Sequence, residues 1–172
     1  PIYTASLTPK DYGIYSLINS FISVAFYFVS LGLESALIRF YSTFTNNKEK
    51  LKRLIGTSII TIFISSSVFS ILCMIFRDSI VNFIMEGVSF YPYIIIGLFH
   101  LGCLSVNIIY RTVLRASGNG KKLTVTSLVV FFSTAIITIL LISVRKYGAV
   151  GILIAAATTQ FVFLLYAVID LK

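Results

Sequence analysis

Residues 54–76 read LIGTSIITIFISSSVFSILCMIF and contain no Asp, Glu, Lys or Arg. Four further charge-free runs of similar length occur at 12–33, 87–110, 123–144 and 147–169. A helix rises about 1.5 Å per residue, so roughly 20 apolar residues cross the hydrocarbon core of a bilayer. Helices of soluble proteins carry a charged face, which these runs lack. The sequence therefore predicts a polytopic membrane protein.

The composition of the 172-residue chain agrees, because only 12% of its residues are charged, against about 25% in an ordinary soluble domain. Backbone groups find no water in the bilayer core, so the runs must form helices or a closed barrel. Barrel strands alternate polar with apolar residues, whereas IITIFI at 59–64 and FVFLL at 161–165 do not. We predict an all-α transmembrane bundle with five spans, near 12–40, 50–76, 90–114, 121–144 and 147–170.

The ends of the sequence and its two cysteines add further expectations. The chain starts Pro1-Ile2-Tyr3, without an initiator Met or a basic leader, and it stops shortly after the last apolar run. We expect residues 1–172 to be a fragment of one transmembrane domain, with material missing at both ends. Cys73 and Cys103 lie inside two apolar runs without a CxxC pattern, which predicts buried thiols rather than a disulfide or a metal site.

The charged connecting segments indicate an orientation. Five crossings place 34–53, 111–122 and the C-terminus on one side with ten basic residues, and leave four on the other side. Lys and Arg concentrate in cytoplasmic loops, so 34–53 and 111–122 are predicted to be cytoplasmic and 1–11 to lie outside. One missing upstream helix would explain that start. The net charge of +8 is thus a signal of topology, and we expect the lipid bilayer rather than nucleic acid as a partner.

A polar face follows the first run. No Pro interrupts LGLESALIRFY at 31–41, so the helix is predicted to continue to about Thr45. At about 100° per residue, several polar or small residues then fall within about 60° of Arg39: Gly32, Ser35, Ser42, Thr43 and Asn46. Arg39, Ser35 and Asn46 are therefore candidate substrate-binding residues in a cavity. The alternative left open is that Arg39 only reaches the cytoplasmic headgroups as an anchor.

The third run carries a second polar stripe, in which His100, Asn107, Arg111 and Arg115 share one side of the helix. Arg111 and Arg115 are one turn apart, so both guanidinium groups can grip one anionic group. Asn107, Arg111 and Arg115 are candidate substrate-binding residues. Alternatively, the two arginines anchor the cytoplasmic end of the helix. For His100, a hydrogen bond between helices is expected.

The last run contains Gln160 near its middle, and Gly151 and Ala155 precede it with the small-xxx-small spacing that lets helices approach closely. We expect Gln160 to form an interhelical hydrogen bond. No enzyme pattern appears: GxSxG and HExxH are absent, and GNGKK at 118–122 lacks the Walker spacing. The sequence predicts a protein that is not an enzyme, without catalytic residues, a metal site or a cofactor.

Four segments match a family pattern in their order and spacing: LTPKDYGIY at 7–15, LGLESALIRFY at 31–41, RTVLRASGNGK at 111–121 and YGAVGIL at 147–153. The first two resemble the entry L-x-P-x-[DE]-[FY]-G and the exit LGL-x-x-A-x-x-R-[FY] of the second helix in the oligosaccharide (O-antigen or polysaccharide) flippase family. The others resemble this family's basic link after helix four and its G-x-x-G opening of helix six. This family belongs to the MATE-like exporter superfamily, and the chain would be helices two to six of a six-helix N-terminal lobe.

The resemblance implies a transporter that flips polyprenyl-diphosphate-linked oligosaccharide across the bacterial cytoplasmic membrane, for synthesis of surface polysaccharide such as the O-antigen of lipopolysaccharide. It implies alternating access around a cationic cavity, in which Arg donors replace the hydration of the diphosphate, and it favours cavity lining for Arg39. Expected partners are the lipid-linked oligosaccharide and other polysaccharide-assembly membrane proteins.

Two alternatives to a flippase stay open. A multidrug or lipid II exporter belongs to the same superfamily, but a drug exporter is expected to carry an intramembrane acid and no run contains one. A membrane polysaccharide polymerase or glycosyltransferase is an enzyme of a different class. It is expected to have a large loop outside, whereas the longest outside connection here is 77–86.

Overall fold

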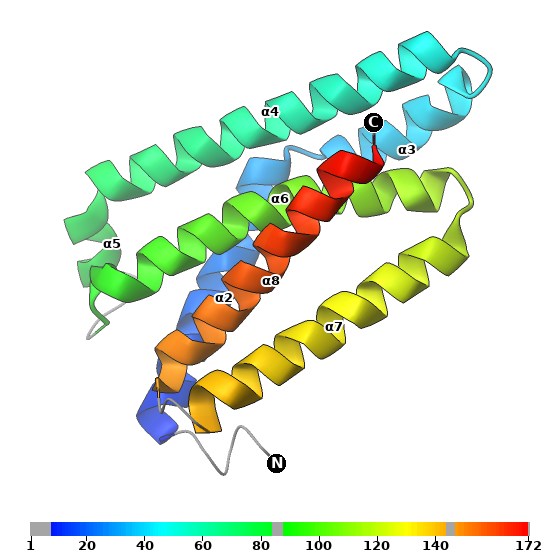
Figure 1. The fold of residues 1–172 in the computed structure, drawn as a ribbon. Coiled ribbons are helices and arrows are strands. Elements are labelled where there is room, and N and C mark those ends of the chain that lie inside the picture. Colours follow the sequence, from blue (N-terminus) through cyan, green and yellow to red (C-terminus); the bar gives the residue numbers. More distant parts are fainter. Residues whose placement is uncertain (1–7, 84–87, 144–146, 172) are drawn as a thin grey trace.

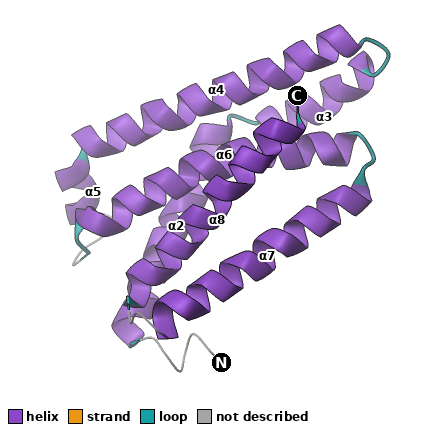
Figure 2. Cartoon of the chain, in the orientation of Figure 1, coloured by secondary structure: helices purple, strands orange, loops and turns teal. Residues whose placement is uncertain are grey.

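The computed structural model of the protein describes residues 8–83, 88–143 and 147–171. These residues form helices joined by short connections, and none of them forms a strand (Figure 1, Figure 2). The elements in chain order are α2 (Pro9–Ser30), α3 (Leu33–Phe44), α4 (Lys48–Ile75), α5 (Arg77–Phe83), the short turn η1 (Phe90–Ile94), α6 (Ile95–Ala116), α7 (Gly120–Ser143) and α8 (Gly148–Asp170).

Five segments are long and apolar enough to cross a membrane, so the all-α class and the five spans predicted from the sequence are confirmed. They are Pro9–Ser30, Lys48–Ile75, Phe90–Ala116, Gly120–Ile142 and Gly148–Asp170. Helix α6 forms the centre of the bundle and packs on α8, α4, α3 and α2, as Figure 1 shows. Its Leu101 and Ile109 are completely buried. In contrast, α7 packs chiefly on α8 and forms one outer side.

The connections lie at two ends of the bundle. The α3–α4 connection at 45–47 and the α6–α7 connection at 117–119 are at one end, and the α4–α5 corner and the start of α8 are at the other (Figure 1). The first end carries the basic residues near 48–53 and 121–122, and we call it the basic end. The ion pair of Asp170 with Lys122 places the C-terminal end of α8 there too. The connecting segments thus alternate between the ends as the charge pattern predicts.

The prediction of one uninterrupted helix across 12–40 is wrong. Helix α2 stops at Ser30, because Leu31 (φ 49°) and Gly32 (φ 70°) adopt the left-handed conformation, which a right-handed helix cannot continue through. The break frees carbonyl groups at the end of α2. The Ser65 hydroxyl of α4 donates a hydrogen bond to one of them, the carbonyl oxygen of Val29, at 2.8 Å.

The break lies near the centre of the membrane-spanning part of α4. Ser65 is the midpoint of the charge-free run 54–76, about 17 Å from either end of that run at the helical rise. From this level α3 runs beside α4 toward the basic end, where the Lys50 ammonium lies 5.9 Å from the centroid of the Phe44 ring. Helix α3 therefore covers the depth between the middle of α4 and the basic end.

At the opposite end, α2 is joined to α8. The Asp11 carboxylate accepts a hydrogen bond from the Ala149 amide at 3.5 Å, where the first amides of α8 favour an anion. Thr8 caps α2, and its hydroxyl also donates to Asp11 at 2.6 Å. Gly148 has φ +54°, and a Cβ there would lie 2.8 Å from the Asp11 carboxylate. Only glycine fits this close approach.

Candidate functional site

The polar face predicted on α3 is exposed. Ser35, Arg39 and Asn46 all lie on the surface of the bundle, as do the neighbouring Gly32, Ser42 and Thr43. The other side of the helix is fixed by Leu37, whose side chain is 1% exposed. Helix α3 therefore packs through one apolar side and presents Ser35 and Arg39 on the other, beginning at the break in the middle of the span. Asn46, predicted on the same helical face, lies beyond the end of α3 in the connection at 45–47.

The Arg39 guanidinium makes no hydrogen bond or ion pair with the residues that the structure describes, whereas its backbone carbonyl accepts bonds from the hydroxyls of Ser42 at 2.8 Å and Thr43 at 3.3 Å. Those two hydroxyls are thus engaged within α3. The five N–H donors of the guanidinium must bond to water, a phosphate or another ligand. Arg39 has the chemistry to bind an anion.

Asn107 takes a different position, inside the contact between α6 and α8. It is completely buried, and its amide nitrogen donates to the backbone oxygen of Gln160 at 2.8 Å and to the Gln160 side-chain oxygen at 2.7 Å. The interhelical hydrogen bond expected for Gln160 is therefore present, and Asn107 is its partner. The Oδ1 atom of Asn107 finds no hydrogen-bond partner within the described part of the chain.

The two arginines of the same stripe differ in their surroundings. Arg111 is half-buried, and its guanidinium carbon lies 5.3 Å from the centroid of the Phe163 ring on α8, a cation–π arrangement. Arg115, one turn further along α6, is exposed. Arg111 thus packs against α8, whereas the Arg115 side chain is open to the surface. His100 is half-buried, and the hydrogen bond expected of it is not formed with any described residue.

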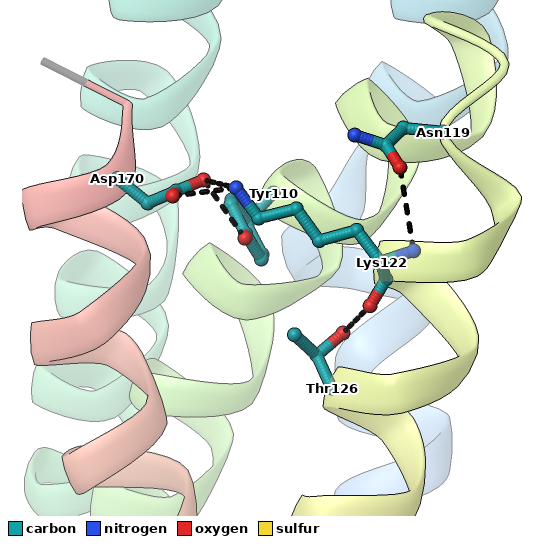
Figure 3. Close-up of polar contacts among 5 residues, drawn as sticks. All are labelled: Tyr110, Asn119, Lys122, Thr126 and Asp170. Carbon is teal, nitrogen blue, oxygen red and sulfur yellow. Dashed lines mark hydrogen bonds and ion pairs between the residues drawn. The ribbon is translucent and has the colours of Figure 1, made fainter.

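A polar cluster that the sequence did not predict joins three helices at the basic end (Figure 3). The Lys122 ammonium of α7 donates to both carboxylate oxygens of Asp170 on α8, at 2.5 and 2.6 Å. The Tyr110 hydroxyl of α6 donates to the same carboxylate at 3.0 Å. Sequence reasoning missed it, although a signal exists: Lys122 and Asp170 each border a charge-free run, on the same predicted side of the membrane.

The basic end therefore gathers cations from four helices: Arg39 on α3, Lys48, Lys50, Lys52 and Arg53 on α4, Arg111 and Arg115 on α6, and Lys121 and Lys122 on α7. Cys73 and Cys103 are buried, as predicted, and both are free thiols. Within the described ranges, the side chains of His, Cys, Asp and Glu form no group of three that would hold a metal ion. The arrangement is suited to contact with anionic groups.

A family model described as "polysaccharide biosynthesis protein" matches residues 6–172. Neither the curated proteins nor the solved structures contain a significant match to the chain. The family match spans all five candidate membrane helices.

Proposed function

Because this chain belongs to a family of polysaccharide biosynthesis proteins, we propose that it is a transporter that flips a polyprenyl-diphosphate-linked oligosaccharide across a membrane. The membrane in this proposal is the bacterial cytoplasmic membrane. In this proposal the basic end lies on the cytoplasmic side of the membrane, because Lys and Arg concentrate in cytoplasmic segments. The protein supplies a path for the glycan rather than catalysing the formation or cleavage of a covalent bond.

The observation that carries this proposal is the exposed polar face of α3. Polar and ionisable groups within the hydrocarbon region face a water-filled cavity or other protein rather than lipid. Arg39 is free of protein partners within the described ranges, and its face begins at the break near mid-span. We infer that α3 lines an aqueous cavity that further helices of the protein complete.

The chemistry of the substrate fits such a cavity. The glycan and its diphosphate must cross about 30 Å of hydrocarbon. A guanidinium group offers a planar fork of donors to phosphate oxygens, so Arg39 would bind the diphosphate. Ser35, on the same face, and Asn46, in the connection after α3, would bond to sugar hydroxyls. Arg115, which is exposed at the basic end, and Arg111 would attract the diphosphate to the entrance.

A vesicle assay tests the proposal. The full-length protein is placed in vesicles that contain a polyprenyl-diphosphate oligosaccharide with a fluorescent sugar, and a membrane-impermeant reagent destroys the accessible fluorophores. We expect the protected half of the fluorescence to become accessible when the protein is present and to stay protected when it is absent. Export of a cationic drug without movement of the glycan would favour a multidrug exporter. Lengthening of the glycan would favour a polymerase.

A further inference from the structure

A groove of about 490 Å³ runs between α7 and α8 on the outer side of the bundle. Its wall is almost entirely apolar and consists of Val125, Thr126, Val129, Val130, Ser133 and Ile137 from α7, with Thr159, Val162, Phe163 and Tyr166 from α8. The hydroxyls of Thr126 and Thr159 donate to carbonyls of their own helices, at 2.8 and 2.7 Å. These hydroxyls therefore demand no partner from an occupant.

The groove has a direction relative to the membrane. Along α7 it extends from Val125 to Ile137, about 18 Å at the helical rise. Val125 is one turn from the basic pair Lys121 and Lys122, and Ile137 lies deep in the charge-free run 123–144. One end of the groove is therefore next to the cations of the basic end, and the other end is in the hydrocarbon.

The α8 side of the groove contacts one of those cations. The Phe163 ring, which forms part of the wall, contacts the Arg111 guanidinium at 5.3 Å and stacks on Tyr166 with ring centroids 6.0 Å apart. Asp170 neutralises Lys122, and Arg111, Arg115 and Lys121 leave this end with a net positive charge. Neither this groove nor those between α2 and α4 and among α4, α6 and α8 has a basic residue in its wall. Among the described residues, the α7–α8 groove differs from the other two because a ring of its wall, Phe163, lies against a guanidinium group.

We propose that the α7–α8 groove binds the polyprenyl tail of the lipid-linked substrate, with the diphosphate beside Arg111, Arg115 and Lys121. This inference rests on the proposed function and adds to it a separate site for the tail. An apolar chain fits the wall because burying apolar area is favourable in proportion to its extent. The anionic head fits the mouth because charges of opposite sign attract and the guanidinium groups offer several donors to phosphate oxygens. Holding the tail there keeps the diphosphate at the basic end while the glycan enters the cavity.

Photo-crosslinking tests the proposal with a matched pair of positions. Val129 lines the groove and Phe132 does not, yet both are on α7 and both are 58% exposed. A benzophenone amino acid replaces one or the other in the full-length protein. The protein is placed in phosphatidylglycerol vesicles that contain a minor fraction of polyprenyl diphosphate. Mass spectrometry then gives the ratio of polyprenyl to phospholipid adducts at each position.

We expect this ratio to be about fivefold higher at position 129 than at 132, which corresponds to a preference of roughly 1 kcal/mol. Ser133→Phe should fill the groove. In that background the adduct ratio at position 129 should fall toward the ratio at position 132, and the ratio at position 132 should not change. Equal ratios at the two positions in the unfilled groove, or enrichment of phospholipid alone at 129, would overturn the proposal. Vesicles with uncharged polyprenol in place of the diphosphate should give a weaker preference for position 129. A preference equal to that of polyprenyl diphosphate would overturn the assignment of the head to the cations.

The two proposals fail in different ways. A protein that enriches the polyprenyl lipid at position 129 but does not translocate the glycan has the groove and lacks the transport activity. A protein that translocates the glycan with equal adduct ratios has the activity and lacks the tail site.

Discussion

The Ser65 hydroxyl in the middle of α4 donates a hydrogen bond to the carbonyl oxygen of Val29 in the last turn of α2, at 2.8 Å. Val29 is completely buried, so its carbonyl has no access to solvent at a depth where unpaired backbone groups are costly. The bond ties the broken helix to its neighbour beside the break at Leu31 and Gly32. The break is thus supported by tertiary contacts and belongs to the folded structure.

Ser65→Ala should destabilise the protein by about 1 kcal/mol, the usual scale of one interhelical hydrogen bond, because the Val29 carbonyl would lose its partner. The measurement is unfolding in mixed micelles, followed by circular dichroism. Ser67→Ala is the matched control, since the Ser67 hydroxyl donates to Phe63 within its own helix. Equal stability of the two variants would show that the Ser65 bond contributes nothing to the break.

Arg39→Ala in the full-length protein should abolish glycan export, because the diphosphate would lose its guanidinium donors. Hydrogen bonds to charged groups contribute about 1.5–3 kcal/mol, so the transport rate should fall by at least about tenfold. Arg39→Lys should be intermediate, since ammonium is a point charge without the planar fork, and Glu34→Gln should be mild. Export is compared at equal protein levels in the membrane. Normal export by Arg39→Ala would leave Arg39 as an anchor only.

The double variant Arg111→Gln, Arg115→Gln should reduce export while the protein still accumulates in the membrane. Both changes weaken the positive charge at the basic end, where the diphosphate is proposed to enter. The measurement is glycan export normalised to membrane-inserted protein. Unchanged export would favour the interpretation in which the two arginines only anchor α6 at the headgroups.

Lys122→Gln should lower the stability of the bundle modestly, as is usual for accessible ion pairs, because Asp170 would keep only its bond from Tyr110. The side chains of Lys122 and Asp170 are 33% and 25% exposed, so the pair is only partly screened by solvent. Thermal unfolding in detergent measures the change. Lys121→Gln is the control, because the Lys121 side chain is exposed and its ammonium forms no ion pair with the described residues. A similar loss in both variants would point to a general effect of charge.

Cysteine labelling tests the orientation. Lys50 is exposed at the basic end and Ser79 is exposed at the other end, so a membrane-impermeant maleimide should label Ser79→Cys in intact cells and leave Lys50→Cys unlabelled until the cells are opened. The native Cys73 and Cys103 are buried and can be replaced by Ala to remove background. Labelling of Lys50→Cys from outside would reverse the proposed topology.

The spans were predictable from the sequence because the absence of charge over the length of a bilayer crossing is a local property with one dominant cause, insertion into lipid. The break between α2 and α3 was not predictable in this way. Leu31-Gly32-Leu33 contains no Pro, and apolar residues continue on both sides. Its support comes from Ser65, which belongs to the next membrane-spanning helix of the chain. A helical periodicity carries no information on such a distant partner.

The same distinction between local and distant contacts applies to the candidate site. The exposed face of Arg39 and Ser35 could be predicted, since it depends only on the step of about 100° per residue within one helix. Asn46 could not be placed in this way, because α3 ends at Phe44. The partner of Gln160 and the cluster around Asp170 depend on how α6, α7 and α8 are placed against each other. That placement is set by packing across the whole bundle, so the sequence indicated a bond for Gln160 without indicating Asn107.

Helix α7 packs chiefly on α8, which follows it in the chain. During synthesis α7 therefore enters the bilayer before its main partner exists, and it must remain there with lipid on nearly all sides. It is also the span with the highest mean hydropathy of the five, which lets it stay inserted without protein contacts. Arrival of α8 then supplies Asp170 for Lys122 and the Ala149 amide for Asp11. Helix α8 thus joins α7, α6 and α2, so that a chain terminated before Gly148 would insert these helices without the contacts that hold them together.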